Sequence, residues 1–297
     1  LARGDIVIDA LLGTGLERDV TGLWRTAIEA INHSGLPVLA VDVPSGLHAD
    51  TGRVMGAAVR AHATVSFIGL KPGLFTAEGP THAGEVLFDD LGVPPAVFEG
   101  IAPVARRITP DNLRDLLAPR RRSAHKGSFG HVLIVGGDRG MPGAVRLAGE
   151  AALRSGAGLV TLATHTAHAP SVNADRPELI VVGVNGPAEL APLLARARVV
   201  AIGPGLQRNS WGGKLFTAAL DARRPLVVDA DALHWLAQEP AQYDSWVLTP
   251  HPGEAAHLLS TTSEVVQADR FAAARAIADK FGGVCVLKGA GTVVCSA

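Results

Sequence analysis

Three loops in the second half of the chain carry side chains that can handle phosphate groups. PLVVDADAL places Asp229 and Asp231 after an apolar run, TPHPGE presents His251 and Glu254, and VCVLKGAGTVV presents Lys288. A lysine supplies a point charge to phosphate oxygens, flanking glycines let backbone N–H groups reach the same oxygens, and carboxylates can organise a metal ion and its water. Alone, each motif also fits a structural role, because such acids often cap helices and the histidine can be a turn residue. Together they indicate a nucleotide site.

Two glycine-rich loops in the same half leave room for a ligand. GGDRGMPGA carries Gly140, Gly143 and Ala144 at the opening of a predicted helix, and VVAIGPGL carries Gly203 and Gly205 at the end of a predicted strand. Small residues let a ligand approach the backbone and face the positive end of the helix dipole. They can equally serve helix–sheet packing, and the two roles are compatible.

The first half has its own carboxylates beside tight turns. DALLGTGLERDVTG places Asp9 in a predicted strand before the turn at Gly13 and Gly15, and VDVPSGL places Asp42 at the end of another strand beside Ser45. A glycine-rich turn exposes backbone N–H groups to an anion, but GTG is neither a full dinucleotide fingerprint nor a P-loop. A strand-end aspartate is often only a turn residue. Neither motif alone defines a function.

Short runs rich in Val, Ile and Leu recur without polar alternation, as in strands that are buried on both faces. We expect strands at residues 6–12, 38–43, 64–70, 132–135, 159–162, 179–182, 199–202, 226–228 and 284–287 and at TVVCSA, and helices at 24–32, 144–155, 213–222 and 268–281. This alternation predicts an α/β fold of βαβ units with parallel sheets. The loops that carry chemistry then collect at the carboxyl ends of the strands, where open α/β sheets bind ligands.

The composition is that of an ordinary globular protein. Among 297 residues, 27 are basic and 28 acidic, the net charge is -1, and aromatic residues make up 4%. We therefore expect no nucleic-acid and no membrane partner, and no run approaches the roughly 18 apolar residues of a membrane span. Cys285 and Cys295 are too few for a disulfide framework or a four-ligand zinc site and fit a reducing cytoplasm. A homo-oligomer is the general expectation.

A domain boundary is predicted between Pro103 and Gly127. We expect one domain at residues 1–103, a linker at 104–124 and a second domain at 125–297. Within the linker, residues 109–117 can form a short helix with Thr109 as N-cap, and the basic run at 120–122 is typical of a solvated segment.

The first-half motifs DALLGTGL, DVPSGL-ADTG and SFIGLKPGL, taken in this order, resemble the second half of the NAD(P)H-hydrate epimerase domain. The resemblance implies a potassium ion bound by Asp9 and Ser45, whose oxygens suit a hard cation. It also makes Asp42 a substrate-binding carboxylate and the candidate proton-transfer group at the hydrated carbon. The segment implied to hold the hydrated nucleotide consists of Gly13, Thr14, Gly15, Leu16, Glu17, Arg18 and Asp19.

The second-half motifs HKG, GGDRGMPGA, RPEL, GPGL, DADAL, TPHPGE and VLKGAGTVV occur in the order seen in ADP/ATP-dependent NAD(P)H-hydrate dehydratases, which have a ribokinase-like fold. The resemblance implies that ADP or ATP, with Mg²⁺, phosphorylates the hydroxyl of the hydrate and that loss of phosphate regenerates NADH or NADPH. The implied substrate contacts are Ala144, Gly205 and His251. The implied adenosine-nucleotide contacts are Lys288, Gly289, Ala290, Gly291 and Thr292, with Lys288 stabilising phosphate charge.

The full expectation is a partial Rossmann-like epimerase domain followed by a ribokinase-like dehydratase domain. The family's asparagine potassium ligand and its later GGMGD-type motif do not occur here, so we expect a fragment of a longer protein whose own activity is impaired. Two alternatives stay open. One is a ribokinase-like small-molecule kinase, which would yield a stable phosphorylated product, and the other is a non-catalytic nucleotide-binding protein, which would bind without turnover.

Overall fold

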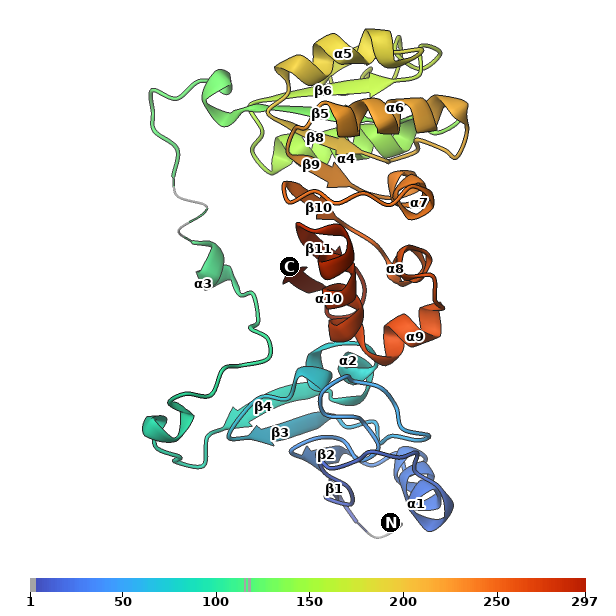
Figure 1. Ribbon diagram of the computed structural model, residues 1–297. Helices are drawn as coiled ribbons and strands as arrows, with labels where there is room; N and C mark the ends of the chain where they lie inside the picture. Colours follow the sequence, from blue (N-terminus) through green and yellow to red (C-terminus); the bar gives the residue numbers. More distant parts are fainter. Residues whose placement is uncertain (1–3, 115, 117–118) are drawn as a thin grey trace. The chain divides into compact units, whose positions relative to one another are not determined.

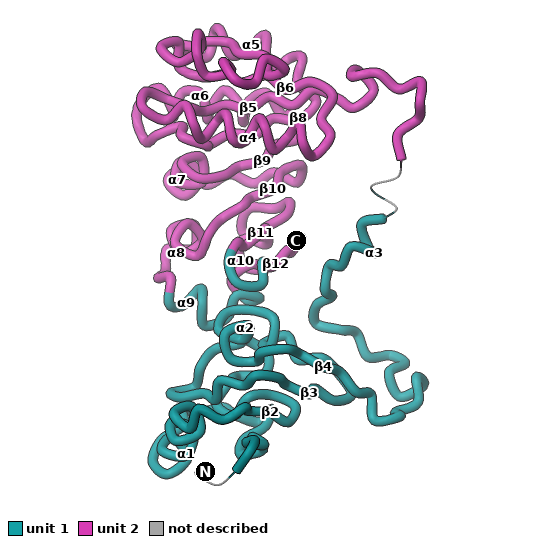
Figure 2. The backbone as a smooth tube through the Cα atoms, turned by 180° about the vertical axis from the view of Figure 1, so that it is seen from behind, with its two compact units in different colours: residues 1–117, 264–272, 289–292 teal, residues 118–263, 273–288, 293–297 magenta. Residues whose placement is uncertain are grey.

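The computed structural model describes residues 4–114, 116 and 119–297. The chain divides into two compact units (Figure 2). Unit 1 comprises residues 1–117, 264–272 and 289–292, and unit 2 comprises residues 118–263, 273–288 and 293–297. The predicted domains at 1–103 and 125–297 stay a prediction, because the units are drawn from segments that alternate along the chain.

Unit 1 contains a four-stranded sheet in the order β1-β2-β3-β4 (Figure 1). Its strands, Val7–Asp9, Val38–Val41, Ala63–Phe67 and Glu85–Asp89, are parallel throughout. Helix α1 (Gly22–Asn32) buries Ile28 and Ile31 in a cluster with Val7, Val38 and Ala40 from the sheet. The carboxyl ends of β1, β2 and β3 therefore lie side by side and bring their loops together.

Unit 2 contains an eight-stranded sheet in the order β12-β11-β10-β9-β8-β5-β6-β7. Every pairing is parallel except that of β11 with β12, which is antiparallel. Its strands are β5 (His131–Val135), β6 (Leu159–Thr164), β7 (Ile180–Gly183), β8 (Val199–Ile202), β9 (Leu226–Val228), β10 (Trp246–Leu248), β11 (Val284–Leu287) and β12 (Val293–Ser296).

The strand order of unit 2 reverses between β5 and β8. The chain steps from β5 to β6 and β7 in one direction, then returns to place β8 on the other side of β5. Because βαβ crossovers are right-handed, opposite directions place their helices on opposite faces of the sheet. A crevice for ligands forms outside the carboxyl ends of the strands at such a reversal. A ligand site is therefore expected at the loops after β5 and β8.

The helices of unit 2 connect these strands. Helix α4 packs on β5 and β6, and α7 and α8 lie next to each other (Figure 1). Their bounds are α4 (Pro142–Arg154), α5 (Pro187–Arg196), α6 (Ser210–Asp221), α7 (Asp231–Gln238) and α8 (Pro252–Leu259). Two further helices, α9 (Ser263–Ala268) and α10 (Arg270–Phe281), contain the points where the chain passes between the units.

Most expected elements are confirmed, with shifted ends. The strand expected at 6–12 covers only Val7–Asp9, because the apolar Leu11 and Leu12 already belong to the loop that follows. Strands β4 and β10 were not expected, and neither were helices α2 (Gly79–His82), α5, α7, α8 and α9. In the expected helix at 109–117, Thr109 caps α3 (Pro110–Leu113), while residues 115 and 117 lie outside the described residues. The described residues contain no helix that is long and apolar enough to cross a membrane.

Candidate functional site

The loops after β5 and β8 meet at the strand-order reversal of unit 2. The Gly137 N–H donates to Pro204 O at 2.9 Å and the Asp138 N–H donates to Gly205 O at 2.8 Å. Gly205 has φ +62°, and a Cβ added there would lie 2.8 Å from Met141 Cβ and 3.3 Å from Ala144 Cβ. The structure thus brings together Ala144 and Gly205, two of the predicted substrate contacts, at a position where a side chain would crowd the loop.

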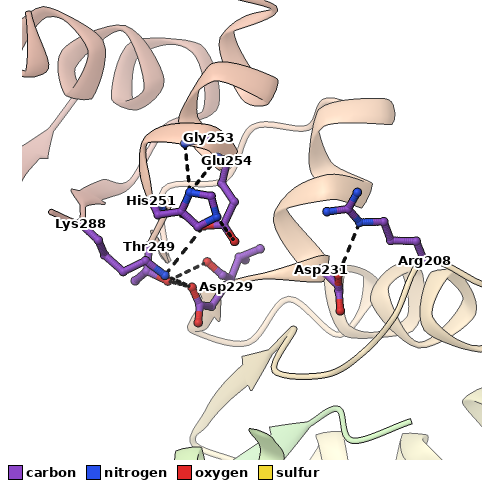
Figure 3. Close-up of polar contacts among 9 residues, drawn as sticks. Arg208, Asp229, Asp231, Thr249, His251, Gly253, Glu254 and Lys288 are labelled. Atoms are coloured by element: carbon purple, nitrogen blue, oxygen red, sulfur yellow. Dashed lines mark hydrogen bonds and ion pairs between the residues drawn. The ribbon is translucent and has the colours of Figure 1, made fainter. Parts of the chain in front are cut away.

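A second cluster forms at the ends of β9, β10 and β11 (Figure 3). Lys288 Nζ donates to Asp229 Oδ1 at 2.6 Å and lies 3.8 Å from Glu254 Oε2. Thr249 Oγ1 donates to the same Asp229 oxygen at 2.8 Å. The Lys288 and Asp229 side chains are 41% and 34% exposed. The lysine is therefore held between two carboxylates and is still open to a ligand.

His251 is the N-cap of α8 and belongs to the same cluster. Its Nδ1 accepts from the Gly253 N–H at 3.0 Å and from the Glu254 N–H at 3.4 Å, while Glu254 Oε2 accepts from the His251 N–H at 2.8 Å. An Nδ1 that accepts leaves the proton of a neutral ring on Nε2. The imidazole is 56% exposed. The capping role and a ligand contact through Nε2 are therefore compatible.

Asp231 lies apart from Lys288, although it is only two positions from Asp229. It starts α7, where its Oδ2 accepts from the Gln207 N–H at 2.9 Å and its Oδ1 lies 3.5 Å from Arg208 Nε (Figure 3). Asp231 therefore stabilises the conformation of the loop after β8 through Gln207 and Arg208. Within the part of the chain that the structure describes, no group of three or more His, Cys, Asp or Glu residues could hold a metal ion. Asp229 and Glu254 fit only a magnesium ion that takes most of its ligands from phosphates and water.

The predicted nucleotide loop KGAGT is divided, with Lys288 in unit 2 and residues 289–292 in unit 1. In unit 1, Thr76 Oγ1 donates to Gly291 O at 3.3 Å and accepts from Arg270 Nε at 3.0 Å. Arg270 is fully buried, and burial lowers the pKa of its guanidinium. The buried side chains of Thr76 and Arg270 thus fix the backbone of this loop at Gly291.

Cys285 precedes this loop in β11 and is not a nucleophile. Its side chain is fully buried, and burial, with a smaller effect of Cys295, raises the pKa of the thiol to about 12. The thiolate is the reactive form, so Cys285 is inert near neutral pH.

In unit 1, Asp9 and Ser45 are in direct contact and fully buried. Ser45 Oγ lies 2.6 Å from Asp9 Oδ1 and 3.2 Å from Leu12 O, and the Ser45 N–H donates to Asp9 Oδ2 at 2.8 Å. A carboxylate, a hydroxyl and a carbonyl oxygen thus converge at the carboxyl end of β1. This donor set fits a hard monovalent or divalent cation.

The predicted substrate loop, residues 13–19, follows this cluster. All of its residues are exposed except Leu16, which is partly buried, and a Cβ added at Gly13 or Gly15 would meet nothing within 4 Å. Asp19 lies 3.8 Å from Arg53. The loop therefore has open space beside both of its glycines.

Asp42 follows β2 in the left-handed region, at φ +70°. Its Oδ1 accepts from the Phe67 N–H at 3.0 Å, from Ser66 Oγ at 3.3 Å and from Lys71 Nζ. Lys71, which contacts this predicted site residue, was not expected from the sequence, although it lies within the SFIGLKPGL motif. A lysine just beyond a strand end was the available signal.

A family model described as NAD(P)H-hydrate dehydratase matches residues 132–297, more than half of the chain. The chain belongs to the NAD(P)H-hydrate dehydratase family. A second model, described as YjeF-related protein N-terminus, matches residues 2–73. The resemblance drawn from the motifs is thereby confirmed for both halves.

The relatives share this arrangement. A bifunctional NAD(P)H-hydrate repair enzyme from Coxiella burnetii is 48% identical over 294 residues, which cover 99% of this chain and 60% of the relative. One from Escherichia coli is 43% identical over 290 residues, covering 98% and 56%. The chain thus spans less than two thirds of the length of these relatives.

Two solved structures share the fold of about three fifths of this chain. The ADP/ATP-dependent NAD(P)H-hydrate dehydratase from Bacillus subtilis, co-crystallized with ATP/Mg²⁺, is 30% identical with a TM-score of 0.51, covering 61% of this chain and 65% of that one. A ribokinase-like superfamily protein from Enterococcus faecalis is 29% identical with a TM-score of 0.54, covering 60% and 64%. The predicted α/β class with a ribokinase-like part is confirmed.

Proposed function

We propose that this chain repairs hydrated NADH and NADPH, and that unit 2 carries the ADP- or ATP-dependent dehydration of the (S)-hydrate. The observation that supports this most is the position of Lys288 between Asp229 and Glu254, with 41% of its side chain exposed. An exposed lysine at the carboxyl edge of a parallel sheet can bind nucleotide phosphates. Family membership supports the same proposal, as does the position of Ala144, whose Cβ would lie 3.3 Å from a Cβ added at Gly205.

In the proposed reaction, a phosphoryl group passes from the nucleotide to the hydroxyl oxygen of the hydrate. Phosphate then leaves with the electrons of the carbon–oxygen bond, and loss of a ring proton restores the double bond of NAD(P)H. Lys288 would neutralise charge on the transferring phosphoryl group, and the glycine-rich residues 289–292 would contact the nucleotide. When bound with the nucleotide, Mg²⁺ would supply further charge neutralisation at the phosphates, with Asp229 and Glu254 as the residues able to hold it.

The substrate would lie across the loops after β5 and β8. Ala144 and Gly205 lie where these two loops meet, with Met141 packed beside Gly205. His251 Nε2 lies 3.5 Å from Glu254 Oε1 and carries the proton of a neutral ring, because Nδ1 accepts the capping N–H groups. In this proposal, these three residues would orient the hydroxyl of the substrate.

For unit 1, we propose the epimerisation of the two NAD(P)H hydrates. Asp9, Ser45 and Leu12 O would hold a potassium ion, which when bound supplies a fixed positive charge beside the substrate loop 13–19. Asp42 would bind the substrate and move the proton that assists departure and return of the hydroxyl. The enzyme would work in the cytoplasm, as a homo-oligomer, without nucleic-acid or membrane partners.

The test is recovery of the near-ultraviolet absorbance of NADH from its purified hydrate, with ATP or ADP and Mg²⁺. We expect slow recovery with this chain, in line with the impaired activity expected from its sequence, and loss of that recovery in Lys288→Met. The matched control is Lys214→Met, which removes an exposed lysine of α6. Accumulation of a stable phosphorylated product would indicate a small-molecule kinase instead. Nucleotide binding without any product would indicate a binding protein.

A further inference from the structure

The carboxylate of Asp42 is held by only one of its two oxygens. Oδ1 accepts from the Phe67 N–H, from Ser66 Oγ and from Lys71 Nζ. Among the residues that the structure describes, no hydrogen bond reaches Oδ2. Asp42 also has no buried oxygen without a partner, so Oδ2 is reached by solvent. One oxygen is thus fixed and the other is available to a ligand.

Lys71 closes a ring of contacts that fixes this carboxylate. Its Nζ donates to Asp42 Oδ1 and also to Phe67 O at 2.8 Å, while the Phe67 N–H donates to the same Asp42 oxygen at 3.0 Å. The end of β3 therefore binds both partners of the ion pair. The Lys71 and Asp42 side chains are only 18% and 26% exposed, so solvent screens the pair less than it screens a surface pair.

The backbone around the pair is strained on both sides. Asp42 has φ +70° and Ile68, between Phe67 and Lys71, has φ +64°. A β-branched residue rarely adopts this region, and such a conformation costs about 1–3 kcal/mol. It persists only where neighbouring contacts determine it. The Asp42 N–H donates to Val65 O at 2.8 Å and the Ile68 N–H donates to Asp89 O at 3.0 Å, and the Lys71 contacts add to these bonds at the end of β3.

We infer that Lys71 is a positioning residue for Asp42, which it holds so that Oδ2 faces the reacting hydroxyl of the nicotinamide hydrate. The inference rests on the epimerisation proposed for unit 1. Lys71 acts through Asp42 and does not touch the substrate. Its loss frees the carboxylate to rotate, so the chemical step slows while the exposed loop 13–19 still binds the nucleotide.

The experiment follows the interconversion of purified (R)- and (S)-NADPH hydrate by the 297-residue chain without ATP or ADP, so that dehydration is silent. We expect Lys71→Met to lower kcat by about 10²-fold, the effect of misplacing a reacting group by about 1 Å, with KM within about twofold. Lys71→Arg restores the cation and is expected to recover part of the rate. Arg25→Met is the matched control, because it removes an exposed ion pair with Glu29 on α1 of the same unit.

Each outcome supports or overturns the positioning role of Lys71. If Lys71→Met folds and retains the kcat of the wild type, or if it changes KM alone, the inference is wrong and the proposed epimerisation stands. If Lys71→Met does not fold, Lys71→Gln is measured, since it retains an N–H donor for Phe67 O. Failure of both variants to fold would assign Lys71 to the stability of the fold and overturn the inference. A wild-type chain that does not interconvert the hydrates would overturn the proposed epimerisation as well.

Discussion

Replacing Lys288 by methionine separates binding of phosphate from stability of the fold. Lys288 Nζ lies 2.6 Å from Asp229 Oδ1 and 3.8 Å from Glu254 Oε2, but the lysine and Asp229 side chains are 41% and 34% exposed. Because solvent screens such a pair, its net contribution to the free energy of unfolding is about 1 kcal/mol. For a unit of this size, that loss lowers Tm by about 2–4 °C.

The expected loss of activity is larger. Removing one preorganised donor to a charge that develops in the transition state costs about 10²–10³ in kcat, which corresponds to about 2.7–4 kcal/mol. The assay compares ATP-dependent recovery of NADH from its hydrate in Lys288→Met, Lys214→Met and the wild type, with Tm recorded for each. A Lys288→Met protein whose kcat/KM stays within about threefold of the wild type would refute the assigned role, whatever its Tm.

Three further outcomes concern glycine, thiol and imidazole groups. Gly46→Ala is expected to lower the free energy of unfolding by about 2–4 kcal/mol, because Gly46 has φ +91° and an added Cβ would lie 1.8 Å from the Ala57 carbonyl oxygen. Gly35 has φ +68° but open space around it, so Gly35→Ala is expected to cost only about 1–2 kcal/mol. Equal losses for the two variants in denaturant unfolding would contradict this expectation. A thiol reagent is expected to modify Cys295 and spare the buried Cys285, whose pKa burial raises to about 12, so two fast thiols in the native protein would be the contrary result. Burial and, to a lesser extent, the charge of Arg196 lower the pKa of His131 below 6.5. The unfolded chain therefore takes up this proton first, and stability falls as the pH drops through 6.5. On acidification, the Tm of His131→Gln is therefore expected to fall less than the Tm of the wild type. The same dependence of Tm on pH in both proteins would contradict this role of His131.

Local sequence predicted the strands well where apolar runs are long. The runs of β5, β6 and β8 have no polar alternation because both faces of a parallel strand are buried, and the pattern is visible in sequence. β4 escaped prediction because GEVLFDD mixes apolar and acidic residues in a strand that is mostly exposed. β10 was also not expected, whereas β9, which is equally short, was. Short or exposed strands depend on pairing with neighbours, which a local pattern does not record.

The sequence by itself determined the family, the α/β class and the loops that carry chemistry, since these are written in contiguous motifs such as DADAL and TPHPGE. It also placed Asp42 and Lys288 at strand ends, whereas Asp9, expected within a strand, proved to be the last residue of β1. The tertiary structure decided the partners of these side chains. Asp229 and Asp231 stand two positions apart, yet the first contacts Lys288 and the second contacts the loop after β8, because β9 ends at Val228 and α7 begins at Asp231. Lys71 contacts Asp42 across 29 positions of sequence, because parallel pairing places the ends of β2 and β3 side by side. Such long-range contacts arise from the order of strands in the sheet, and no spacing along the chain specifies them.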